Sequence, residues 1–187
     1  MTDLWLVRHG QTDWNVSGRL QGQAGQAPGL NAVGRAQALA LRVQLENIRF
    51  SAVYSSDLLR SRETAHLIAA PLGLTITLEP RLREMHLGAW EGMFSIDVEE
   101  RYPQQLAERM HNPLNANAPQ GESLLEVAER VVAATTEIAK KHTSETVLLV
   151  GHGVSLAVII CYAQGITLDQ VYRKIPDNAV LNHVRWD

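Results

Sequence analysis

The sequence predicts an α/β protein, a three-layer sandwich in which helices cover both faces of a mostly parallel central sheet. Short apolar segments alternate along the chain with amphipathic stretches of helical period, and this alternation is typical of parallel sheets. The chain has 187 residues, and a chain of this size buries roughly 70% of its unfolded surface. We therefore expect one domain, residues 1–187, with a core that needs no disulfide or structural metal.

The first half of the chain contains three predicted strands and two predicted helices. The strands are residues 4–7, 52–54 and 75–78, each a short apolar or β-branched run. Asn31 is a predicted N-cap for a helix over residues 32–47, whose apolar side chains share one face. Asp57 is predicted to cap a helix that runs to Ala70, where Pro71 and Gly73 end it.

Residues 86–121 interrupt this regular pattern. The segment contains three prolines, several Asn and Gly residues and only short helical pieces near residues 96–102 and 104–110. We expect it to form a small cap-like insertion over the carboxyl ends of the strands.

The second half resumes the alternation at Ser123, which with Glu126 forms a capping-box pattern for a helix ending near residue 141. A strand follows at 146–150, and residues 154–163, apolar except for Ser155 and Tyr162, predict a buried helix. A short helix opened by Thr167 and a last strand over 179–186 complete the predicted elements.

Composition excludes several classes of protein. The net charge is −3 and the pI is near 6.2, with both signs interspersed, so a nucleic acid or a membrane surface is not an expected partner. Cys161 is the single cysteine and excludes an internal disulfide. The apolar runs are too short for a signal peptide or a membrane span. The sequence predicts a cytoplasmic protein.

Two histidines follow predicted strands at their carboxyl ends, each beside a glycine. The first strand leads into Arg8, His9 and Gly10, and the strand at 146–150 leads into His152 between two glycines. Ligand sites in open parallel sheets lie beyond the carboxyl ends of strands, and glycine lets the backbone approach a ligand. If the two strands are neighbours, the histidines share one site.

Three interpretations of the histidine pair stay open at this point. Each histidine can simply satisfy a hydrogen bond near a strand end. The pair can bind a metal, with Glu84 or Asp13 as third ligand, although the cation of Arg8 disfavours a second cation beside it. The pair can also bind an anion, because Arg and His side chains gather around phosphoryl groups. The Arg-His-Gly context favours the anion over the metal.

Three further polar residues follow predicted strands or lie in the first loop. Arg60 begins the helix after the second strand, Glu84 follows the third strand, and Asn15 lies in the loop after His9. Taken alone, each is an ordinary surface or turn residue.

Several blocks of sequence strengthen the anion interpretation by their order. They are Arg8-His9-Gly10-Gln11-Thr12 with Trp14 and Asn15, Gly18-Arg19-Leu20-Gln21-Gly22, Ser55-Ser56-Asp57-Leu58-Leu59-Arg60, Leu82-Arg83-Glu84, Gly88-Ala89-Trp90-Glu91-Gly92, Gly121-Glu122-Ser123 and Gly151-His152-Gly153. Together they resemble the signature of the histidine phosphatase superfamily, in its phosphoglycerate-mutase-like branch. The sequence departs from the family pattern at residues 24–28, which contain no acidic residue, and at Val154, where a second glycine is usual.

The resemblance implies phosphoryl transfer through a phosphohistidine, with His9 as the nucleophile and Glu84 as the proton donor to the leaving oxygen. It implies that the other site residues hold the phosphate or substrate: Arg8, Arg60 and His152 as catalytic cations, and Asn15, Gln21, Gly22 and Gly153 as binding residues. Positioned donors of this kind do most of the catalysis of phosphoryl transfer. Because these cations already neutralise a phosphate, we expect no metal and no cofactor.

The family contains both phosphatases and mutases. The sequence ends at Asp187 without a further tail, and we expect water to reach the phosphoenzyme, which favours hydrolysis of small phosphomonoesters. A phosphoglycerate mutase is the alternative, and a non-catalytic module that binds a phosphorylated ligand is the alternative of another class. The expected partner is a small phosphorylated metabolite. Trp90, Met93, Phe94, Tyr102, Met110 and Leu114 of the insertion either line a substrate pocket or form the insertion's own core, and Arg109 and His111 either contact a charged substrate or face solvent.

Overall fold

The computed structural model describes residues 1–187, apart from the side chain of Leu72. One sheet contains five strands in the order β3-β2-β4-β1-β5. Their bounds are β1 Thr2–Arg8, β2 Ala52–Ser55, β3 Ile76–Leu78, β4 Thr146–Gly151 and β5 Leu181–Trp186. The first four strands are parallel and β5 is antiparallel to β1. The predicted mostly parallel sheet is confirmed.

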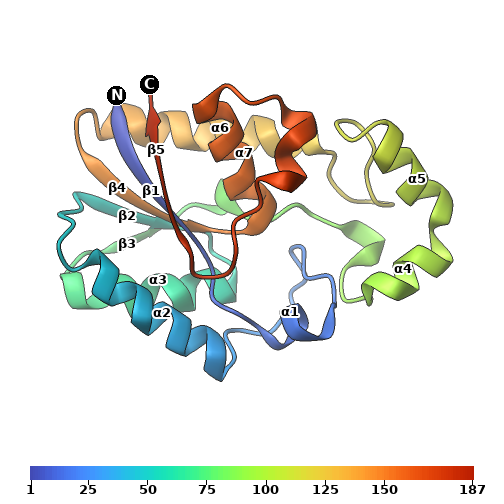
Figure 1. The fold of residues 1–187 in the computed structure, drawn as a ribbon, viewed down its shortest axis with the longest axis horizontal. Helices are drawn as coiled ribbons and strands as arrows, with labels where there is room; N and C mark the ends of the chain where they lie inside the picture. Colours follow the sequence, from blue (N-terminus) through green and yellow to red (C-terminus); the bar gives the residue numbers. More distant parts are fainter.

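Helices cover both faces of the sheet (Figure 1). One face packs against α2 (Ala32–Leu45) and α3 (Leu59–Ala69), and the other against α6 (Leu124–Lys141) and α7 (Gly153–Gln164). Successive strand residues alternate between the two cores, because side chains of a strand point to opposite faces. Leu6 packs on the side of α6 and α7, whereas Val7 packs on the side of α2 and α3. The three-layer sandwich is therefore confirmed.

Short helices connect these layers. Their bounds are α1 Asp13–Ser17, η1 Ala70–Leu72, η2 Pro80–Leu82, η3 Gly88–Trp90, α4 Ser95–Arg101, α5 Pro103–His111 and η4 Leu168–Arg173. Helix α1 was not predicted, although Thr12 and Asn15 form a reciprocal capping box at its start. In Figure 1, α4 and α5 lie beside the sandwich and not on it. Within the described residues, no helix is both long and apolar enough to cross a bilayer.

The segment 86–121 has a small apolar cluster of its own, in which Trp90, Val98 and Ala118 are buried. An isolated bridge between Arg19 and Phe94 joins this segment to the loop after α1. The segment and that loop are therefore in direct contact.

Two predicted boundaries are wrong. Asp57 does not cap α3, whose N-cap residue is Leu58, because the Asp57 carboxylate instead binds both Nε and Nη2 of Arg83. The last strand begins at Leu181 and not at residue 179, because Ala179 has a φ of 52° and so leaves the extended conformation. Asn31 caps α2 as predicted, and the Ser123–Glu126 capping box is present.

Candidate active site

The two strand-end histidines lie side by side because β1 and β4 are neighbours. Val7 pairs with Val150 and Arg8 with Gly151 in the parallel register. The amide of His9 donates to the carbonyl of Gly151 over 3.0 Å. The imidazole centroids of His9 and His152 are 5.2 Å apart. The first and fourth strands thus deliver both rings to one place.

His9 is held with one ring nitrogen free of a proton. Nδ1 lies 2.8 Å from the carbonyl oxygen of Gly10, and since a carbonyl only accepts, Nδ1 carries the proton and Nε2 carries the lone pair. Nε of Arg60 donates to that Nε2 over 3.1 Å. Burial, followed by the charges of Arg60 and Arg8, lowers the pKa of His9 well below 6.5. The ring is therefore neutral at neutral pH.

Arg60 lies almost fully buried in the first turn of α3, with 2% of its surface exposed. Besides contacting His9, its Nη2 donates to the carbonyl of Gly22 over 2.9 Å. Burial lowers the pKa of Arg60 to about 10, so its guanidinium is still charged at neutral pH. Gly22 has a φ of 50°, a left-handed conformation that favours glycine.

His152 is the N-cap residue of α7 and is fully buried. Its Nε2 lies 2.8 Å from the Ser56 hydroxyl, and that hydroxyl oxygen accepts from the Leu58 amide. The Ser56 proton is thus available to Nε2, which leaves the proton of a neutral ring on Nδ1. Nδ1 is buried without a partner among the described residues. Burial, then the charges of Arg60 and His9, lowers the pKa of His152 well below 6.5.

Arg8 and Glu84 lie on either side of Gly153, at the start of α7. A Cβ placed on Gly153 would be 3.4 Å from a carboxylate oxygen of Glu84 and 3.5 Å from the guanidinium carbon of Arg8. The Val154 amide donates to both Glu84 oxygens, at 3.1 and 3.2 Å. Arg8 donates to the Pro176 carbonyl over 2.8 Å, while its Nε is buried without a partner in the described part of the chain. Burial lowers the pKa of Arg8.

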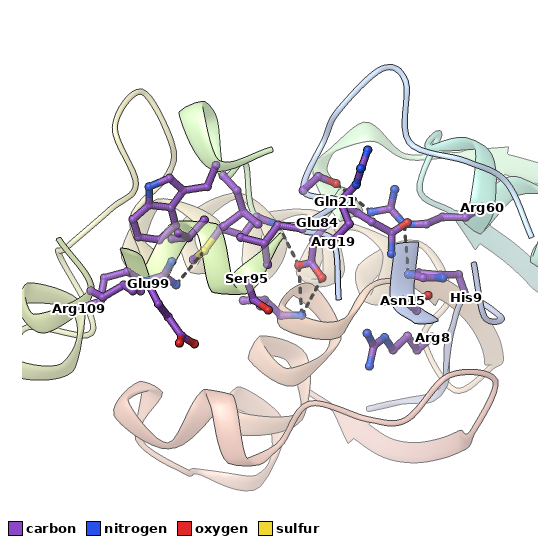
Figure 2. Close-up of a pocket in the computed structure, with 18 residues that line it drawn as sticks. Arg8, His9, Asn15, Arg19, Gln21, Arg60, Glu84, Ser95, Glu99 and Arg109 are labelled. Carbon is purple, nitrogen blue, oxygen red and sulfur yellow. Dashed lines mark hydrogen bonds between the residues drawn. The ribbon is translucent and has the colours of Figure 1, made fainter. Parts of the chain in front are cut away.

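A cavity of about 390 Å³ opens beside these groups (Figure 2). Its lining is Arg8, His9, Asn15, Arg19, Leu20, Gln21, Gly22, Arg60, Glu84, Met85, Leu87, Trp90, Ser95, Val98, Glu99, Leu106, Arg109 and Val154. His9, Arg8, Arg60 and Asn15 lie at one end in Figure 2, and Arg109 lies at the other. The first end is cationic, and the other is largely apolar.

Of the nine predicted site residues, seven line this cavity, and two do not. The His152 ring lies beside that of His9, with 5.2 Å between the centroids, and Gly153 lies next to Glu84 and Arg8. Asn15 and Gln21 share one hydroxyl, since Thr12 Oγ1 lies 3.1 Å from the side-chain oxygen of each and its single proton serves both.

The outer end of the cavity was predicted less well. Trp90 and Arg109 line it as expected, whereas the other six candidates do not: Met93, Phe94, Tyr102, Met110, Leu114 and His111. Arg19, Ser95 and Glu99 were missed, and only the position of Arg19 inside a recognised block signals it. Asp13, the alternative metal ligand, is exposed on α1. Within the described residues, no three carboxylate, imidazole or thiol groups form a metal-binding cluster.

The fold and this concentration of cations around a neutral histidine define a protein that handles phosphoryl groups. Residues 4–187 match the model of the histidine phosphatase superfamily, branch 1, and the chain belongs to this superfamily. It is an enzyme of the histidine phosphatase type, among whose relatives mutase-like members also occur.

Three relatives illustrate the similarity. Phosphoserine phosphatase 1 of Hydrogenobacter thermophilus is 35% identical over 179 residues, which are 96% of this chain and 84% of that protein. The probable phosphoglycerate mutase GpmB of Escherichia fergusonii is 36% identical over 170 residues, which are 89% of this chain and 76% of that protein. The crystal structure of the alpha-ribazole phosphatase from Shigella flexneri has a TM-score of 0.89 and 26% identity, and the match covers 99% of this chain and 91% of that one.

Proposed function

We propose that this chain hydrolyses small phosphomonoesters without a metal, through a phosphohistidine on His9. The observation that carries the proposal is the state of His9: a buried neutral imidazole whose Nδ1 proton is held by the Gly10 carbonyl and whose Nε2 lone pair faces the cations of the cavity. A nucleophile must offer a free lone pair, and a phosphate needs fixed positive charge around it.

In the first step, the Nε–H of Arg60 shifts its hydrogen bond from Nε2 of His9 to a phosphoryl oxygen, Nε2 attacks phosphorus, and the bond from phosphorus to the ester oxygen breaks. Glu84, in its protonated form, gives its proton to the departing oxygen, which leaves as an alcohol. Arg8, Arg60 and the Nδ1–H of His152 stabilise the negative charge on the phosphoryl oxygens. The unpartnered Nε of Arg8 and Nδ1 of His152 support this role, because an oxyanion satisfies both buried groups.

In the second step, water attacks the phosphohistidine and Glu84 takes up a proton of that water. The phosphorus–nitrogen bond breaks, its electron pair returns to Nε2, and inorganic phosphate leaves. Asn15, Gln21 and Gly22 border the cationic end of the cavity and bind the phosphate or the adjoining part of the substrate. Gly153 lies next to Glu84 and Arg8 and leaves room for them to approach each other.

We propose that residues 1–187 form one domain and that residues 86–121 act as a cap over the site. Trp90, Val98, Leu106 and Arg109 of this segment line the outer end of the cavity. The cap therefore selects the alcohol part of the ester, whereas the sandwich selects the phosphate. The volume of about 390 Å³ suits a small metabolite.

Phosphate release from a panel of phosphomonoesters in EDTA tests the proposal. His9→Ala abolishes turnover, and radiolabelled substrate leaves alkali-stable, acid-labile phosphate on the wild-type protein but not on this variant. His111→Ala, an exposed histidine outside the cavity, retains full activity. Full activity of His9→Ala, or loss of wild-type activity in EDTA, would refute the proposal.

The mutase alternative is supported by the similarity to the probable phosphoglycerate mutase. It predicts that phosphoglycerate isomers interconvert faster than phosphate is released, with or without a bisphosphorylated primer. Phosphate release without such interconversion would exclude it.

A further inference from the structure

The backbone that carries Glu84 lies outside regular secondary structure. Glu84 lies in the link between η2 and η3, where carbonyl oxygens have no ladder or helix partners. Such part-buried groups need other donors. The Glu84 carboxylate accepts from the amides of Met85 and Val154, and the backbone that carries it is held by the groups that donate to this link.

Arg130, which projects from α6, supplies most of these donors, and Nε2 of Gln23 adds one more to the Glu84 carbonyl over 2.9 Å. Nη1 of Arg130 donates to the carbonyls of Arg81 and Arg83, both over 2.8 Å, and its Nη2 donates to the carbonyl of Glu84 over 3.0 Å. The side chain is 19% exposed. One guanidinium thus binds three carbonyls of four consecutive residues, a geometry that the five fixed donors of arginine permit and a lysine cannot reproduce.

Glu122 fixes Arg130 in turn. Its two carboxylate oxygens accept from Nε and Nη2 of Arg130, each over 2.7 Å, and Oε2 also accepts from the His86 amide over 2.8 Å. Glu122 therefore joins α6 to the backbone just after Glu84. The guanidinium has no N–H directed at the cavity in these contacts, and neither Arg130 nor Glu122 lines it.

We propose that Arg130, oriented by Glu122, is a positioning residue that sets the placement of Glu84 for proton transfer to the leaving oxygen. The inference rests on the proposed function, in which Glu84 is the acid. Proton transfer by a placed acid contributes roughly 100- to 10,000-fold to a rate, and a displacement of about 1 Å at a reacting group costs roughly 100-fold. Loss of the Arg130 contacts therefore impairs one chemical role while the phosphate-binding cations stay in place.

The leaving group separates this role from a purely structural one. The departing oxygen of p-nitrophenyl phosphate is stable as an anion and needs little help from an acid, whereas an alkyl ester such as phosphoethanolamine needs the proton. Values of kcat/KM report the steps up to departure of this group. A loss of folded protein lowers both values equally, so their ratio reports the placement of Glu84 alone.

The experiment measures this ratio in Arg130→Met, Arg130→Lys, Glu122→Gln and Glu84→Gln. We expect Arg130→Met to lower kcat/KM for phosphoethanolamine roughly tenfold or more relative to that for p-nitrophenyl phosphate. Arg130→Lys and Glu122→Gln should lower this ratio by less. In the Glu84→Gln background, Arg130→Met changes the ratio no further, because the acid is already absent.

Glu137→Gln is the matched control. Glu137 lies on the same helix and pairs with the side chain of Arg81, at the start of the same link, without touching the backbone of Glu84. The Glu137→Gln variant should leave the ratio of the two kcat/KM values unchanged. An equal loss on both esters in the Arg130 variants, an unchanged ratio, or a further shift in the Glu84→Gln background would overturn the inference. If Glu84→Gln itself left the ratio unchanged, the acid role in the proposed function would fall with it, and the two failures are thus distinguishable.

Discussion

The guanidinium of Arg60 donates from Nε to Nε2 of His9 over 3.1 Å, so a buried cation binds the unprotonated nitrogen of a buried imidazole. Adding a proton to that ring would place two positive charges in contact and leave Arg60 without its acceptor. The contact therefore keeps His9 neutral, and a phosphoryl group that enters the cavity meets the lone pair and the cation together.

Stability should depend on pH through this pair of buried rings. Burial lowers the pKa of both His9 and His152 well below 6.5, so between those lowered values and pH 6.5 the unfolded chain binds more protons than the folded one. The free energy of unfolding is therefore highest above pH 6.5. It decreases as the pH falls below 6.5, by at most about 1.4 kcal/mol per pH unit for each ring. Urea unfolding between about pH 5 and 7.5 measures this slope.

His9→Asn should remove one of the two buried histidines and so roughly halve the change in unfolding free energy per pH unit. His66→Asn, at an exposed position of α3, serves as the control and keeps the wild-type slope. An unaltered slope in His9→Asn would show that other groups dominate the acid sensitivity.

Ser56→Ala should impair catalysis through His152. The variant removes the partner of Nε2 at 2.8 Å, leaving a buried ring nitrogen unsatisfied, which costs about 1–3 kcal/mol. It also frees the proton to occupy either nitrogen, so Nδ1 no longer donates reliably to a phosphoryl oxygen. We expect kcat/KM to fall roughly tenfold, in line with the loss of part of one charge-stabilising contact.

Ser55→Ala is the matched control for this variant. Its hydroxyl is equally buried and bonds to the Ser56 carbonyl and to Ser61, without contacting His152. Both variants should lose similar stability in urea unfolding. Equal losses of kcat/KM would contradict a specific role of Ser56.

The sequence predicted the features that depend on local pattern or on strand order. The sheet, the Asn31 cap and the Ser123–Glu126 capping box follow from neighbouring residues, and the meeting of His9 with His152 follows from adjacent parallel strands. The Asp57 cap failed because a charged partner, Arg83, lies 26 residues away in sequence. A local pattern carries no information about such a competitor.

The contacts that tune the site were beyond a single sequence for the same reason. Arg130 occupies a polar position of an amphipathic helix and resembles any solvated arginine, yet its acceptors lie 46 to 49 residues earlier. The proton position on His9 depends on where one backbone carbonyl points. Both the contacts of Arg130 and the position of the His9 proton depend on the packed tertiary structure.

Gly34→Ala should disturb the loop that carries His9. A Cβ at Gly34 would lie 2.7 Å from the Gln11 amide nitrogen and closer still to its carbonyl oxygen, so α2 and the loop must separate. Overpacking of this kind costs about 1–3 kcal/mol, and activity should fall as the Gly10 carbonyl shifts away from Nδ1. Gly25→Ala has no atom within 4 Å of its Cβ and should change neither property. If Gly34→Ala were as stable as the wild-type protein, the close approach of Gly34 to the Gln11 backbone would be contradicted.

Two further arginines that line the cavity should favour esters with a second anionic group. Arg19 stacks over Trp14 and Phe94, at 5.3 and 4.5 Å from the ring centroids, and Arg109 lies 5.4 Å from that of Trp90. In the described part of the chain, neither guanidinium forms an ion pair with a carboxylate. A substrate carboxylate that reaches either one gains a charged hydrogen bond, worth about 1.5–3 kcal/mol.

Phosphoserine and phosphoethanolamine differ only in this carboxylate, so the ratio of their kcat/KM values isolates its contribution. Arg109→Met keeps the packing on Trp90 and should lower the ratio roughly tenfold or more, and Arg19→Met should act in the same direction. Arg101→Met, on the exposed side of α4 and outside the cavity lining, should leave the ratio unchanged. If both arginine variants lowered the two values equally, these guanidinium groups would serve the cap's packing and not the recognition of an anion.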